Sequence, residues 1–146
     1  MDAESLFPPG FHDIELQALE EIFVRPFPSS LRRPKLLSGL LEVLSILHGF
    51  AMPLEIWLNG SFATKKQEPD DVDALIIANF EAVDSLSNSH QQFLEELTDN
   101  KAYAKSVFFG DFFLMFDDNL NMRSYWRGLF GFDRAENPKG IPRIIL

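Results

Sequence analysis

The sequence predicts an α+β fold in which helices flank a mixed β-sheet. Short apolar runs that suit strands alternate with longer stretches whose leucines recur at three- and four-residue spacing, as they do on helices. The 146 residues are 46% hydrophobic and 24% charged, a balance typical of a folded domain rather than a disordered chain. Because no repeat, low-complexity tract or linker divides residues 1–146, we expect a single domain.

Two helices are expected in the first third of the chain. A short one is expected over residues 13–23, capped by Asp13 and ended by the prolines that follow. A longer one is expected to begin at Ser29 or Ser30 and to end at Gly49. Its leucines form one apolar stripe, so it should pack against the core.

Strands and helices are expected to alternate in the rest of the chain. Strands are predicted over residues 54–58, 72–78 and 107–116, the last interrupted by Gly110. Helices are predicted over residues 80–97, with a break near 87–89, and over 122–129. Residues 141–146 either add a final strand or lie along the core.

Composition excludes several classes of function. With a formal net charge of −9 the chain is not expected to bind nucleic acid in general, because such binding depends on neutralising phosphates. The absence of cysteine excludes disulfides and thiolate metal sites. No apolar stretch approaches the roughly 20 residues that span a bilayer, and the first residues lack a secretory signal. We therefore expect a cytoplasmic protein without membrane contact.

A basic cluster precedes the leucine stripe. We interpret these charges as a solvated face or as the beginning of a helix rather than as a nucleic-acid site. The residues are Arg25, Arg32, Arg33 and Lys35.

Asp71 and Asp73 are the first candidate site residues. They lie two apart where a strand is expected to begin, so both carboxylates should face the same way, roughly 7 Å apart at the backbone. Two such carboxylates repel each other and are costly to bury. A divalent cation removes that cost, and Mg²⁺ typically binds one or two protein carboxylates together with substrate phosphates. The pair therefore predicts a Mg²⁺ site.

Gly60 and Ser61 form the second half of the candidate site. A glycine directly after a strand permits the close backbone approach of a phosphate-binding turn, and the serine hydroxyl can donate to a phosphate. Lys65 and Lys66 follow in a polar loop and are candidates to neutralise phosphate charge, although a solvated loop is the favoured explanation for them. The expected ligand is an NTP.

Together these residues resemble the signature of the nucleotidyltransferase superfamily. That signature is a hydrophobic residue before Gly-Ser, followed after nine residues by Asp-hydrophobic-Asp-hydrophobic. Here the two parts read Leu58-Asn59-Gly60-Ser61 and Asp71-Val72-Asp73-Ala74. The departures are polar Asn59 before the glycine and the small Ala74 at the end.

A looser resemblance covers nearly the whole chain. It is to a small, uncharacterised bacterial family of nucleotidyltransferase-like proteins. The matching segments are FPPGFH at residues 7–12, DDVD at 70–73, LFGFDR at 129–134 and PKGI at 138–141.

The resemblance implies a nucleotidyltransferase-like mixed sheet and Mg²⁺-dependent transfer of a nucleotide, with ATP the expected donor, to a protein or small-molecule hydroxyl. Members usually carry a third carboxylate on a later strand. Asp111 is our candidate, because a charge in so apolar a run needs a reason, although a bulge at Gly110 would turn it into solvent. Asp117 and Asp118 are weaker candidates, since such a cluster after a strand is normally a turn.

Three functions remain open from the sequence. The first is the enzyme, whose small bacterial relatives often act on a partner protein as antitoxins or in phage defence, a setting that is analogy only. The second is a catalytically inactive module that keeps the fold and binds a nucleotide or a partner. The third is a structural protein that docks another chain through an aromatic surface.

Overall fold

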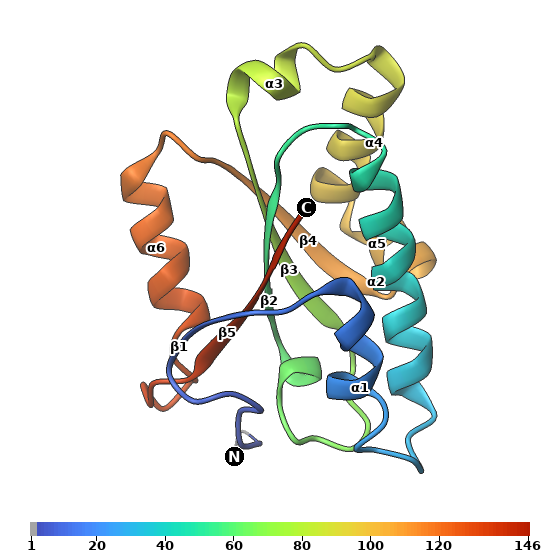
Figure 1. Ribbon diagram of the computed structural model, residues 1–146, viewed down its shortest axis with the longest axis vertical. Coiled ribbons are helices and arrows are strands. Elements are labelled where there is room, and N and C mark those ends of the chain that lie inside the picture. The colour runs from blue at the N-terminus through green and yellow to red at the C-terminus, as the bar shows by residue number, and fades with distance from the viewer. Residues whose placement is uncertain (1–2) are drawn as a thin grey trace.

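A mixed sheet forms the centre of the computed structural model, which describes residues 3–146 (Figure 1). Within that range five strands lie in the order β1-β5-β2-β3-β4. Strand β2 is antiparallel to both of its neighbours, whereas β1 pairs with β5, and β3 with β4, in parallel. The strands are β1 (Gly10–Asp13), β2 (Glu55–Asn59), β3 (Val72–Ala78), β4 (Gly110–Phe116) and β5 (Gly140–Ile145). The predicted α+β class with a mixed sheet is confirmed.

Helices cover the two faces of the sheet unequally. Figure 1 shows α1, α2, α4 and α5 on one side of the sheet and α6 on the other. The helices are α1 (Leu19–Phe23), α2 (Arg32–His48), α3 (Phe80–Asp84), α4 (Asn88–Asp99), α5 (Lys101–Phe108) and α6 (Leu120–Phe130). Over the described part of the chain, none of them has both the length and the apolar character needed to cross a membrane.

Alternation along β3 divides its side chains between two cores. Ala74 and Ile76 belong to the larger core beneath α2, α4 and α5, whereas Leu75 and Ile77 belong to a smaller core beneath α6. Because alternate residues of a strand share a face, Asp73 lies on the α6 side with Leu75. The site residues are therefore carried on the more open face of the sheet.

One glycine brings the helices of the larger core close together. A Cβ on Gly39 of α2 would lie 2.2 Å from the backbone oxygen of Phe108, the last residue of α5. Because glycine has no side chain, α2 can pack directly on the end of α5. Strand β4 begins two residues after Phe108, at Gly110.

Two sequence predictions were wrong in their extent. Residues 13–23 do not form one helix: Gly10–Asp13 pair with β5 as a strand, and a 3₁₀ turn at Leu16–Ala18 precedes the short α1. The predicted strand over 107–116 begins only at Gly110. Residues 107 and 108 belong to α5 instead. The helix ends there, and Phe109, which follows it, has a left-handed backbone with φ 62°.

Other elements agree closely with the sequence predictions. Strand β3 has the predicted bounds, and Gly49 caps the end of α2. The break between α3 and α4 lies at residues 85–87, slightly before the predicted 87–89. The last residues do form a strand, β5. Helix α2 begins at Arg32, two or three residues later than expected, and the Ser30 hydroxyl accepts the Arg33 amide at 3.0 Å.

Candidate functional site

Three carboxylates meet on the α6 face of the sheet. Asp73 in β3 lies opposite Asp111 in the parallel β3–β4 register, and Asp71 immediately precedes β3. One oxygen from each of the three lies within 4.8 Å of the others. We call these residues the acidic triad. Its three oxygen ligands could hold a metal ion.

The structure groups Asp111, rather than Asp117 or Asp118, with Asp71 and Asp73. It faces the other two carboxylates and is not turned into solvent by a bulge, whereas Asp117 and Asp118 are exposed beyond the end of β4. Among the described residues, the buried Oδ1 of Asp111 has no hydrogen-bond partner. An orphaned carboxylate oxygen beside two more carboxylates fits a divalent cation. Mg²⁺, Mn²⁺ and Ca²⁺ all accept such ligands, so the geometry does not select the ion.

Burial and like charge make Asp73 reluctant to ionise. Burial contributes most, and the charges of Asp71 and Asp111 add to it, so that the pKa of Asp73 rises from 3.8 to about 6. The cations Lys105 and Lys139 act in the opposite direction. Such a group is stabilised as an anion when a cation binds beside it.

Lys105 already places one cation beside the triad. From α5 its Nζ lies 3.5 Å from Asp71 Oδ2 and 3.6 Å from Asp111 Oδ2. The two carboxylates in turn raise the pKa of Lys105, with Asp111 contributing most. The lysine therefore offsets part of the repulsion within the triad.

We expect Lys105→Met to raise the affinity of the triad for a divalent metal by about threefold to tenfold, because a competing positive charge is removed. Mn²⁺ titration by calorimetry measures this effect. Lys101→Met is the matched control, since it removes the same charge from the same helix while its Nζ lies 4.1 Å from the Phe113 ring centre. A lower Mn²⁺ affinity in Lys105→Met than in the control would contradict this expectation.

Gly60 brings the backbone against the triad. Its φ of 82° and ψ of −176° are values that a residue with a side chain rarely adopts. A Cβ built on Gly60 would lie 3.1 Å from Asp73 Oδ2. Ser61 follows in a 3₁₀ turn, and its Oγ accepts the Asp70 amide at 3.2 Å. The turn is thus tied to the residue that precedes Asp71.

The two predicted loop lysines have partners away from the triad. Lys65 pairs with Glu4 at 2.9 Å and Lys66 with Asp70 at 3.4 Å, and all four side chains are largely exposed. Both lysines line the same cleft as Asp71 and Asp73. Their role in binding phosphate stays a prediction.

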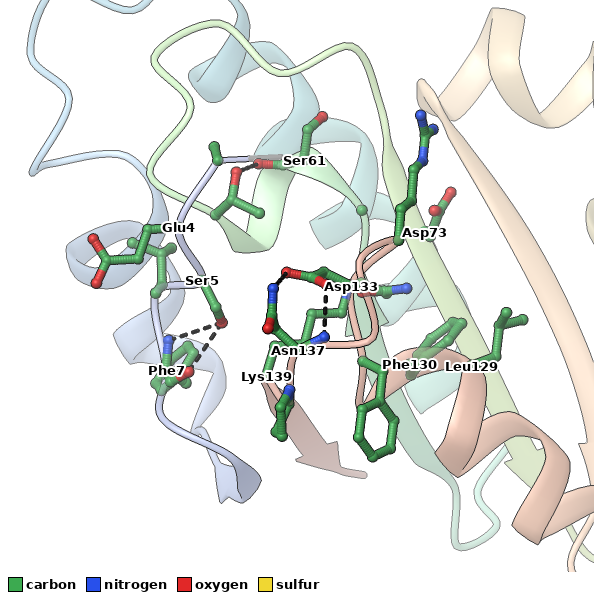
Figure 2. Close-up of a pocket in the computed structure, with 18 of the residues that line it drawn as sticks. Glu4, Ser5, Phe7, Ser61, Asp73, Leu129, Phe130, Asp133, Asn137 and Lys139 are labelled. Atoms are coloured by element: carbon green, nitrogen blue, oxygen red, sulfur yellow. Dashed lines mark hydrogen bonds between the residues drawn. The ribbon is translucent and has the colours of Figure 1, made fainter. Parts of the chain in front are cut away.

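A cleft of about 2080 Å³ extends from the triad. Figure 2 shows Ser61 and Asp73 near one end of it, with the Asp133–Asn137 loop standing between two walls. The N-terminal wall includes Glu4, Ser5 and Phe7, and the other includes Leu129 and Phe130. Asp133 fixes the loop by accepting the amides of Ala135 and Asn137 at 2.9 Å. Of the described residues that line the cleft, none is Asp111, which lies one strand further out.

Two cations lie near the site although sequence reasoning did not place them there. Lys139 donates to Asn59 Oδ1 at 2.6 Å, and Asn59 is the register partner of Asp73. The segment around Lys139 resembles the bacterial family, but the sequence does not show that this lysine lies near the site. Lys105 gave no signal, because only the fold of α5 against β4 brings it to the triad.

The comparisons with known proteins give a family but no activity. No curated protein and no solved structure gives a significant match. Residues 1–145 match the family model described as a family of unknown function, DUF6932. The chain therefore belongs to DUF6932.

Proposed function

We propose that this chain is a Mg²⁺-dependent nucleotidyltransferase of the cytoplasm that uses an NTP, with ATP the first to test. The observation that carries the proposal is the meeting of Asp71, Asp73 and Asp111 beside Gly60. Two strands and a glycine turn supply these groups, in the arrangement that the superfamily signature implies. The acceptor is a hydroxyl of a protein or a small molecule.

The proposed reaction divides its work among these residues. The acceptor oxygen forms a bond to the α-phosphorus, the bond from that phosphorus to the bridging oxygen breaks, and pyrophosphate leaves. A bound metal supplies charge neutralisation for the attacking and leaving oxygens. Asp71 and Asp73 would hold the metal. Asp111 would either join them, in which case the acceptor's proton passes to solvent, or take that proton itself. The Ser61 hydroxyl accepts one amide and keeps its own proton to donate to a phosphate oxygen.

The cleft is large enough to hold two substrates. Pockets for single small molecules usually measure about 300–1,000 Å³, and this cleft measures about 2080 Å³. An NTP bound at the triad would leave room beside it for an acceptor. The proposed enzyme requires such room, because the two reactants must be held together.

A second candidate function is an inactive module that docks a partner. Lys105 occupies two carboxylates of the triad as a metal would, which favours a site that no longer needs one. Apolar side chains also lie exposed along the cleft, with Tyr125 at 58%, Leu129 at 50% and Phe132 at 45% exposure. Nucleotide binding without turnover would support this function.

Thermal unfolding with Mg²⁺ and each NTP tests the proposal. A ligand at 100 times its Kd stabilises the folded state by about 2.7 kcal/mol, which a melting curve resolves. We expect a metal-dependent rise in Tm that disappears in the double variant Asp71→Asn/Asp73→Asn. The control Asp117→Asn/Asp118→Asn makes the same change of charge in the exposed turn after β4 and should keep the rise. No rise with any NTP in folded wild-type protein would contradict the proposal.

A further inference from the structure

A nine-residue segment, 62–70, joins the Gly60-Ser61 turn to Asp71 and lies against the beginning of α2. Arg33 of that helix has no exposed surface. Its guanidinium makes five hydrogen bonds, each to a backbone carbonyl. The acceptors are Phe23 and Phe62 at 2.9 Å, Thr64 at 2.6 Å, and Lys66 at 2.7 and 3.1 Å.

These bonds use every donor that an arginine side chain has. The guanidinium also lies 3.7 Å from the ring centre of Phe27. Burial lowers the pKa of Arg33 to about 10, so the group is still charged at neutral pH. A lysine has three donors on a single atom and cannot reproduce this planar set. The site therefore requires arginine. Arg33 lies at the beginning of a helix, which is one of the two expectations for the basic cluster, but it is buried rather than part of a solvated face.

Arg32 holds the other end of the segment. Its Nε donates to the carbonyl of Pro69 at 2.7 Å, and its Nη2 donates to the carbonyl of Asp70. Glu68, within the segment, also binds the beginning of α2, because its carboxylate accepts the amides of Leu31 and Arg32 at 3.0 and 3.3 Å. Between them the two arginines bind five of the nine carbonyls, those of Phe62, Thr64, Lys66, Pro69 and Asp70.

We propose that Arg33 and Arg32 are positioning residues that fix segment 62–70 and thereby place the Gly60-Ser61 turn and Asp71 for ligand binding. Both ends of the segment belong to the site, so freedom within it would separate the turn from the triad. Holding it in advance removes the cost of ordering it when a metal or nucleotide binds. The binding consequence rests on the proposed function, but the order of the segment does not.

Two variants and two controls test this role. Arg33→Met removes all five bonds, and Arg32→Gln removes the bonds beside Asp71 from an exposed side chain whose loss should leave the protein folded. Leu44→Ala is a control for lost stability on the same helix, where Leu44 is 1% exposed in the larger core. Arg25→Gln is a control for lost charge, since Arg25 pairs with Glu21 at 3.6 Å on the surface.

The affinity for Mn²⁺ separates positioning from charge by its sign. Removing a positive charge alone strengthens the binding of a cation. Loss of positioning weakens it, and we expect a loss of about tenfold to a hundredfold in Arg33→Met and a smaller loss in Arg32→Gln. Both controls should stay within about twofold of wild type, measured by calorimetry well below each Tm.

Amide hydrogen exchange over residues 62–70 is the second measurement, and it needs no ligand. We expect faster exchange there in both arginine variants, with wild-type exchange in this segment for Arg25→Gln. Wild-type exchange in Arg32→Gln and in folded Arg33→Met would overturn the positioning role. If wild-type protein binds no Mn²⁺, the proposed function is contradicted, and the exchange result decides the positioning role by itself.

Discussion

Asp73→Asn should make the metal-free protein more stable at pH 7.5, by up to about 3 kcal/mol. Burial and the neighbouring carboxylates raise the pKa of Asp73 from 3.8 to about 6. At pH 7.5 the folded wild-type protein must therefore keep a charge that its surroundings disfavour. Asparagine has nearly the same shape and carries no charge, so the variant avoids this cost.

The gain should depend on pH in one direction. Between about pH 4 and pH 6 the unfolded chain loses the Asp73 proton while the folded protein retains it. The stability of the wild type should fall as pH rises through this window and then level off. At pH 4 the folded protein holds the Asp73 proton and the unfolded chain still holds it in part, so little of the cost has developed and the gain in Asp73→Asn should be small there. Urea unfolding in EDTA at pH 4, 5, 6 and 7.5 measures the difference.

Asp117→Asn is the matched control for this pH series. It removes a carboxylate that is exposed beyond β4, and its free energy of unfolding should differ little from that of wild type at every pH.

Mg²⁺ should stabilise wild-type protein more at pH 7.5 than at pH 5, because protons compete with the metal for Asp73. If Asp73→Asn were less stable than wild type at pH 7.5 without metal, the ionised Asp73 carboxylate would not destabilise the folded protein, and the prediction would be contradicted.

The acidic pair and its strand were readable from the sequence because the signal is local. Residues 72–78 form one continuous apolar run, and two-residue spacing puts Asp71 and Asp73 where it begins. The third carboxylate needed a long-range fact, the parallel register that sets Asp111 opposite Asp73. Sequence reasoning could name Asp111 as out of place in an apolar strand, but it could not align two strands.

The wrong boundaries also have long-range causes. Residues 10–13 form a strand because β5 offers them a parallel partner more than a hundred residues later in the chain. Val107 and Phe108 favour strands by propensity, yet they end α5, which packs on Gly39 of α2. In both places tertiary contacts outweigh local preference.

Arg33 shows the same limit for the candidate site. In the sequence it is one of several clustered charges, and such charges are usually solvated. Its burial depends on carbonyls from α1 and from segment 62–70 that converge only in the folded chain. Asp71 and Asp73 could therefore be proposed from their spacing, whereas Arg33, which holds the segment before them, could not.

Gly60→Ala should destabilise the protein by about 1–3 kcal/mol, because φ 82° with ψ −176° lies in a region that only glycine adopts readily. The new Cβ would also lie 3.1 Å from Asp73 Oδ2 and 3.3 Å from Asp73 Cγ. Either the turn or the carboxylate must move, so metal affinity should fall together with stability. Urea unfolding in EDTA and Mn²⁺ titration measure the two effects separately.

Gly128→Ala is a control of opposite sign. Gly128 lies within α6, and a Cβ there meets nothing within 4 Å. Alanine favours a helix over glycine by up to about 1 kcal/mol, so this variant should be more stable than wild type and bind Mn²⁺ equally well. If Gly60→Ala matched wild type in both measurements, the turn would not be held against Asp73. The proposal of a nucleotide site would then be weakened, because it depends on the close approach of the Gly60 backbone to Asp73.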